Sequence, residues 1–173
     1  AARRWWLPIA LAMLLTGCTG LPEGVQPVQS FEVDRYLGTW YEIARLDHSF
    51  ERGLSRVTAS YRLRDDGGIA VVNRGFDAAA GEWKEAEGKA YFVGPPDTAH
   101  LKVSFFGPFY GTYAVFELEP EEYRHAFISG YSTDYLWLLA REPRVEDEVL
   151  EQFKVQAAAL GFDLNELIIV EHD

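Results

Sequence analysis

Short β-rich segments separated by turn residues fill most of the chain between residues 38 and 140. The turn Asp65-Asp66-Gly67-Gly68 is the clearest separator, because Asp and Gly tolerate the positive φ of tight hairpins. We expect about eight strands, at 38–46, 57–63, 69–76, 85–93, 101–106, 113–118, 125–129 and 135–140. Since a chain of 173 residues is long enough for one domain, this pattern predicts a single sandwich or up-and-down barrel.

One segment near the C-terminus has helical periodicity. Between residues 145 and 160, the apolar residues that share one helix face are Val149, Leu150, Phe153, Ala157 and Leu160. The acidic residues 146–148 suit the positive end of the helix dipole, and Gly161 is a typical C-terminal stop. The apolar face needs a partner, and the outside of the predicted barrel is the simplest one. A short strand at 167–170 should follow.

The first residues have the pattern of a bacterial signal sequence. Arg3 and Arg4 form a short basic region, and the apolar run 5–15 is shorter than the ~20 residues that cross a bilayer. The run leads to Cys18, which is the one cysteine of the chain, so no disulfide can form within it. The preceding Leu-Thr-Gly resembles a lipobox, which implies cleavage before Cys18 and acylation of its thiol and its new amino terminus. The alternative is a signal peptide that contains a cysteine by chance.

We therefore expect three parts: a lipoprotein signal peptide (1–17), a lipidated flexible tether (18–30) and a barrel domain (31–173). The tether prediction rests on the Gly, Pro and Gln content of residues 19–30. By resemblance to Gram-negative lipoproteins, Thr19 in place of Asp implies the outer membrane. The formal net charge of −11 argues against nucleic acid as a partner and against electrostatic docking on anionic lipid.

Three short motifs favour a barrel over a sandwich. Their residues are Gly38, Trp40, Thr133, Asp134, Tyr135 and Arg141. In their order and spacing, with a helix after them, they resemble the G-x-W, T-D-Y and arginine motifs of the lipocalin family. The resemblance covers residues 31–171 and is strongest to the bacterial outer-membrane lipocalins. It implies an all-β fold: an eight-stranded antiparallel up-and-down barrel with one C-terminal α-helix packed outside.

The resemblance also implies how the barrel is closed. Trp40 should plug one end, and the Arg141 guanidinium should stack on its ring and donate hydrogen bonds to carbonyls of residues 32–37. The alternative is an ordinary strand tryptophan and a surface arginine. In the lipocalin arrangement these residues maintain the fold and do not contact the ligand's reactive groups.

Strand alternation, aligned with the family pattern, predicts which side chains line the interior. The predicted ligand-cavity residues are Ala44, Ala59, Tyr61, Val71, Ala90, Val103, Phe105, Phe116, Trp137 and Leu139. Glu42, Val57, Ile69, Ala114 and Tyr135 should also point inward. The small alanines leave space inside an otherwise apolar and aromatic wall, which suits an alkyl chain. The alternative is a dry core filled by these side chains.

The sequence therefore predicts a membrane-anchored barrel with an apolar cavity. The resemblance implies a non-catalytic protein that stores or transports fatty acids, lysophospholipids or phospholipids in envelope maintenance. We expect no catalytic residues, metal or cofactor. Attachment would be to the outer membrane through acylated Cys18, with the domain facing the periplasm. A homodimer is left open.

Two other functions stay open at this stage. A lipocalin-fold carrier of haem or another apolar cofactor would need an inward axial histidine, and only His125 lies within a predicted strand. A lipid-modifying enzyme could use Glu42 as a general acid, although a structural pairing of Glu42 with a buried Tyr or Arg is the simpler hypothesis.

Overall fold

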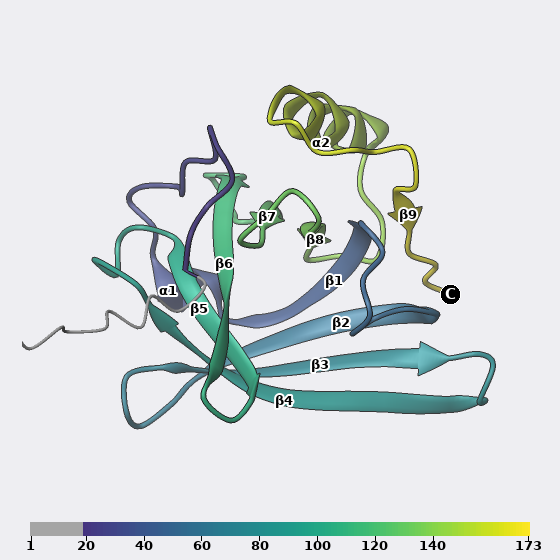
Figure 1. Cartoon of the computed structure of the whole chain (residues 1–173), viewed down its shortest axis with the longest axis horizontal. Coiled ribbons are helices and arrows are strands. Elements are labelled where there is room, and N and C mark those ends of the chain that lie inside the picture. Colours follow the sequence, from purple (N-terminus) through teal and green to yellow (C-terminus); the bar gives the residue numbers. More distant parts are fainter. Residues whose placement is uncertain (1–18) are drawn as a thin grey trace, which may run out of the picture.

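The computed structural model describes residues 19–173, which form one closed antiparallel barrel (Figure 1). The strands are β1 (Gly38–Arg45), β2 (Leu54–Leu63), β3 (Ile69–Asp77), β4 (Glu82–Phe92), β5 (His100–Phe106), β6 (Phe109–Leu118), β7 (His125–Ser129), β8 (Leu136–Ala140) and β9 (Ile168–Ile169). Each strand from β1 to β7 pairs with the strand that follows it. Since β8 pairs with β1, the sheet is closed. The predicted eight-stranded up-and-down barrel is confirmed, and β9 is added beside β1.

Two helices accompany the barrel. The helix α1 (Val33–Tyr36) crosses one end just before β1, and the sequence pattern did not predict it. The helix α2 (Asp147–Ala159) follows β8 and packs outside the barrel, as expected. Within the described residues, no helix is long and apolar enough to cross a membrane.

The apolar side chains form two separate cores. The first lies inside the barrel and includes Trp40, Val115 and Ile128. The second lies between the outer face of the sheet and α2, where Phe127 and Phe153 meet with ring centroids 5.1 Å apart. Part of the sheet is therefore buried on both faces, and its strands are rich in apolar residues on both sides.

The segment 19–30 is packed against the barrel, so the expectation of a flexible tether is wrong for this part of the chain. The backbone N–H of Val28 donates to the Val115 carbonyl at 2.8 Å, and the Val28 carbonyl accepts from Ala99 at 2.9 Å. Val25 is buried in the core beside α2. The Gly and Pro content correctly excludes regular structure, but apolar residues between them find partners on the sheet. Cys18 and the signal sequence lie outside the described residues.

Candidate functional site

The barrel encloses a cavity of about 810 Å³, within the ~300–1,000 Å³ typical of small-molecule sites. Its wall is mostly apolar. The sequence-predicted residues that line it are Ala59, Tyr61, Val71, Ala90, Val103, Phe105, Trp137 and Leu139, together with Glu42, Val57, Ile69 and Tyr135. Except for Tyr135, which lies just before β8, these side chains come from β1 to β5 and from β8, because alternate residues of each strand face the interior.

Ala44 does not line the cavity, and a β-bulge in β1 explains why. Glu42 pairs with Leu139 and Ala44 with Leu138, so two steps along β1 match one step along β8. The extra residue turns Ala44 to the outer face, where it is buried in the core under α2. Beyond the bulge it is Arg45 whose guanidinium meets the inward Glu42.

The expectation for Phe116 is wrong because the facing of β6 is the reverse of the predicted one: Tyr113 and Val115 belong to the interior core. Val115 and Glu117 of β6 pair with consecutive residues of β7, which leaves Phe116 as the extra residue of a second bulge. Phe116 lies in the outer core beside α2. Ala114 does not line the cavity either, whereas its neighbour Tyr113 does. The two misplaced alanines remove some of the predicted space, but the cavity remains.

One end of the barrel is closed by Trp40 and Arg141. The Arg141 guanidinium lies 3.9 Å from the centroid of the Trp40 ring. It donates to the carbonyls of Arg35 at 2.7 Å and Leu37 at 3.0 Å, on the chain that crosses this end. Gly38 has φ of +99°, and a Cβ there would lie 3.4 Å from Arg141 Nη1. The glycine therefore allows both the turn into β1 and the approach of the guanidinium.

The T-D-Y residues lie at the other end of the barrel. Thr133 and Asp134 are exposed in the loop between β7 and β8, where Ser132 Oγ contacts Asp134 Oδ2 at 3.2 Å. Tyr135 stacks on Trp137 with centroids 6.3 Å apart, at the cavity wall. Of the three motifs, only G-x-W and the arginine are brought together.

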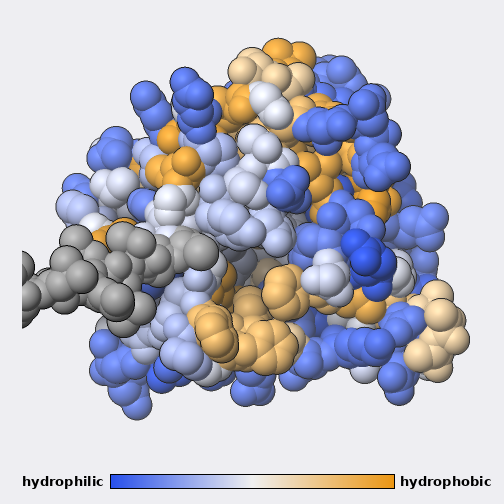
Figure 2. Space-filling model, viewed as in Figure 1, coloured by the Kyte–Doolittle hydropathy of each residue, from blue (hydrophilic) through white to orange (hydrophobic). Residues whose placement is uncertain are grey.

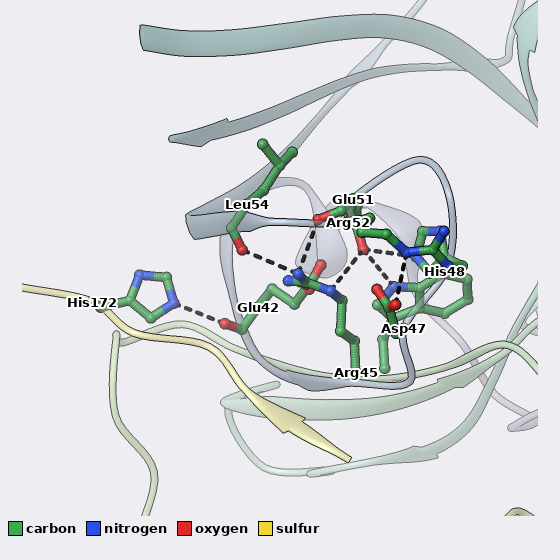
Figure 3. A network of polar contacts seen from close by, with 9 residues as sticks. Glu42, Arg45, Asp47, His48, Glu51, Arg52, Leu54 and His172 are labelled. Carbon is green, nitrogen blue, oxygen red and sulfur yellow. Dashed lines mark hydrogen bonds and ion pairs between the residues drawn. The ribbon is translucent and has the colours of Figure 1, made fainter. Parts of the chain in front are cut away.

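A buried network of ionisable side chains forms one part of the cavity wall (Figure 3). Arg45 Nη1 donates to Glu42 Oε1 at 2.9 Å, and its Nη2 donates to the Glu51 carbonyl at 2.9 Å. The Glu51 carboxylate in turn contacts His48 Nε2 at 2.8 Å and accepts from Trp137 Nε1 at 3.1 Å. All but Trp137 are buried. The network supports the structural hypothesis for Glu42, since its carboxyl is paired with a buried arginine.

The two carboxyls of this network differ in their pKa. Burial, together with the nearby Glu51 carboxylate, holds the pKa of Glu42 well above its usual range, despite the pairing with Arg45. Burial also opposes ionisation of Glu51, but hydrogen bonds from His48 and other neighbours outweigh it and lower the Glu51 pKa. Of the two carboxyls, Glu51 therefore loses its proton at the lower pH and is the first to balance the Arg45 charge.

A second polar cluster lies in the interior close to Trp40. The Tyr113 hydroxyl is 2.6 Å from that of Tyr36 and 2.9 Å from that of Tyr61. Burial raises the pKa of all three tyrosines, so the hydroxyls stay neutral. Sequence reasoning found Tyr61 but missed Tyr36 and Tyr113, because it missed α1 and misassigned the facing of β6.

Arg45, His48 and Glu51 were also missed by sequence reasoning. Simple alternation from Glu42 places Arg45 on the outer face, and only the bulge reverses this. His48 and Glu51 lie in the loop before β2, where no periodicity predicts a direction. One signal was available in the sequence. His48 and Glu51 are three residues apart, and they follow a strand that already carries the inward-facing Glu42.

The site offers few groups for chemistry beyond binding. His125 does not line the cavity; it stacks on Phe127, whose ring lies in the core beside α2. His48 does line the cavity, but its Nε2 is engaged by Glu51. Within residues 19–173, no group of three His, Cys, Asp or Glu residues is arranged to hold a metal ion. The geometry suits enclosure of an apolar molecule.

Comparison with known proteins agrees with this geometry. The model of the family described as "Lipocalin-like domain" matches residues 31–172. The chain is 61% identical over 163 residues to Outer membrane lipoprotein Blc of Vibrio cholerae, covering 94% of this chain and 95% of that protein. It is 53% identical over 162 residues to the protein of that name in Escherichia coli K12, covering 92% and 91%. Insecticyanin from the tobacco hornworm Manduca sexta has a similar fold, with a TM-score of 0.68 and 20% identity, over 89% of this chain and 87% of that one.

Proposed function

Because this chain belongs to the lipocalin-like domain family, we propose that it is a binding protein that holds a fatty acid, lysophospholipid or phospholipid inside its barrel. The observation that carries this proposal is the cavity of about 810 Å³, whose wall is mostly apolar and aromatic. Enclosure of an alkyl chain removes both the wall and the ligand from water, which drives binding without any chemical step.

The size of this effect supports a useful affinity. A chain of about sixteen carbons gains roughly 12 kcal/mol when it is fully buried, at ~0.8 kcal/mol per CH₂. Association and ordering cost several kcal/mol, which leaves a micromolar or tighter complex. The polar head should stay at the open end, away from Trp40, because a charge without a partner is costly to bury. We therefore expect affinity to follow chain length more than head group.

We further propose that the protein is attached to the outer membrane through acylated Cys18, with the barrel on the periplasmic side. The lipobox-like sequence before Cys18 supports acylation. The relatives from Vibrio cholerae and Escherichia coli are named outer membrane lipoproteins, which supports the location. A lipid-binding barrel held at a membrane would store or transport lipids during envelope maintenance.

Substitution Ala59→Trp tests the site of binding. Ala59 is buried on the cavity wall, opposite Trp40 in the pairing of β1 with β2. An indole at this position should fill the cavity and abolish binding of lysophosphatidylcholine, measured by calorimetry below its micelle concentration.

The matched control is Thr58→Trp, which adds the same side chain to the same strand on the opposite face. This variant should bind as the unchanged chain does. Full affinity in a folded Ala59→Trp protein would contradict the proposal and move the ligand to an external surface.

A further inference from the structure

Large aromatic rings are exposed at the open end of the barrel, away from Trp40. Phe50, between β1 and β2, is 67% exposed, and Phe106 and Phe109, at the turn between β5 and β6, are 65% and 76% exposed. The rings of Phe50 and Phe106 stack with centroids 6.3 Å apart, so side chains from two loops form one patch. Figure 2 shows apolar side chains gathered in the lower middle of this face, over the turn between β5 and β6. Such a patch on a soluble domain marks an interaction surface.

The patch is unusually free of charge. A quarter of the chain's residues are charged, yet residues 103–116, which include the turn between β5 and β6, contain none. Near Phe50, the exposed Arg52 is paired with Asp47 at 2.8 Å. The acids that give the chain its net charge of −11 are therefore kept away from this turn.

The packed N-terminal segment lies against β5 and β6, where the Thr19 carbonyl accepts a hydrogen bond from His100 Nε2 at 3.0 Å, at the start of β5. The Gly20 carbonyl accepts a hydrogen bond from Thr112 Oγ1 at 2.8 Å. Thr112 lies three residues from Phe109 on β6, which is ~10 Å along a strand. Cys18 precedes Gly20 by two residues in the sequence, so the described chain begins beside β5 and β6, one residue after the proposed acylation site.

We propose that Phe50, Phe106 and Phe109 insert into the surface of the membrane that holds the acyl chains of Cys18, so that the open end of the barrel rests on the bilayer. This inference rests on the proposed function, because it needs both a lipid cargo and a lipid anchor. Phenylalanine rings gain by leaving water for the acyl region, and a bilayer accepts them without a matching protein surface. A ligand then passes between bilayer and cavity without crossing water.

The test uses the full acylated chain reconstituted in vesicles of phosphatidylethanolamine and phosphatidylglycerol. Because Cys18 is the one native cysteine, Phe109→Cys provides a unique thiol for a fluorophore once Cys18 is acylated. The matched control is Val155→Cys, at an apolar residue of α2 that is 68% exposed and lies outside the patch. Nitroxide groups on the lipid acyl chains quench only a fluorophore that enters the bilayer.

We expect the label at position 109 to be quenched at least about threefold more than the label at position 155, as burial of an apolar side chain in the bilayer requires. Equal quenching at both positions would overturn the proposal. So would close contact between two 109 labels in detergent without vesicles, because that would assign the patch to a second copy of the chain. A reactive thiol in the unchanged protein would instead show that Cys18 is not acylated, which is a failure of the proposed anchor.

A transfer experiment separates docking from binding. In the double variant Phe106→Ser and Phe109→Ser, transfer of a fluorescent lysophospholipid from donor vesicles to the protein should slow roughly tenfold, since docking limits the rate. Affinity for the same lipid presented as monomers should fall much less than the transfer rate, because both rings lie at the mouth of the cavity and are mostly exposed. Unchanged transfer would overturn the inference, whereas no binding of monomers by the unchanged chain would overturn the proposed function itself.

Discussion

At the scale of single residues, Arg141 joins three parts of the closed end. Its guanidinium lies over the Trp40 ring and donates to the carbonyls of Arg35 and Leu37, while the Trp40 Nε1 donates to the Tyr36 carbonyl at 2.8 Å. The chain that crosses the barrel end thus has its exposed carbonyls satisfied by side chains. This contact closes the barrel without taking part in the cavity wall.

Arg141→Ala should therefore cost stability more than affinity. Loss of the stacking and of the hydrogen bonds to the crossing chain should lower the free energy of unfolding by ~2–4 kcal/mol. Thermal and denaturant melts measure this change, with Arg62→Ala, an exposed arginine on β2, as the control. A melting temperature equal to that of the control would mean that Arg141 is merely a surface residue.

The buried Glu42 predicts a pH dependence of stability. Its pKa is raised by burial and by Glu51, above the ~4.3 of an unfolded glutamate. Between these two values the folded chain holds a proton that the unfolded chain has lost, so this group's contribution to stability falls as pH rises. The lowered pKa of Glu51 acts in the opposite direction and at lower pH, where stability is lost as pH falls.

Glu42→Gln should remove the first of these effects. The amide stays neutral like the protonated carboxyl, so the unfolding free energy of the variant should fall less steeply above pH 5 than that of the unchanged chain. Denaturant melts across this pH range give the slope. A variant with the same slope as the unchanged chain would contradict the assignment, and Glu87→Gln, on the exposed part of β4, is the control.

At the scale of elements, the β-bulge in β1 decides which side chains of that strand reach the cavity wall. It places both Glu42 and Arg45 at the interior network and turns Ala44 to the outer core. Because a bulge changes the facing of the residues that follow it, alternate positions of one strand can point into the barrel before the bulge and into the outer core after it. The outer core is what fixes α2 to the barrel.

Phe153→Ala tests that attachment. Phe153 is fully buried against Phe127, and its truncation should lower the free energy of unfolding by ~3–5 kcal/mol, typical of a buried ring. Chemical denaturation measures the loss, and Val155→Ala, an exposed residue of the same helix, should be close to neutral. Lipid affinity at a temperature where both variants are folded should be unchanged, because neither side chain lines the cavity. Equal losses in both variants would mean that α2 does not depend on this contact.

At the scale of the whole molecule, the proposed function joins a lipid anchor at Cys18 to the barrel. Cys18→Ser should leave the precursor uncleaved and without acyl chains, because the thiol is the acceptor in a lipobox. Two or three acyl chains give stable attachment where one does not, at ~0.8 kcal/mol per buried CH₂. Labelling of cells with palmitate, followed by membrane fractionation, measures both effects. Palmitate retained by the variant would contradict acylation at Cys18.

Most of the fold could be predicted because its signals are local. Hairpin turns, β-rich segments and the amphipathic helix each depend on a few neighbouring residues, and the G-x-W and arginine motifs determine how the barrel is closed. The cavity was predicted less completely. Ala59 and Val103 line it as expected, whereas Ala44 follows a bulge and Phe116 lies on a strand whose facing was misassigned, so neither lines it.

The sequence by itself determined the fold class, the position of the outer helix, the plug at Trp40 and the apolar character of the interior. Only the tertiary structure decided the network around Arg45, the cluster at Tyr113 and the packing of residues 19–30. The physical reason is the range of the interactions involved. One extra residue in a strand reverses the facing of every side chain after it, and a segment without periodicity is ordered only by partners that lie far away in the chain.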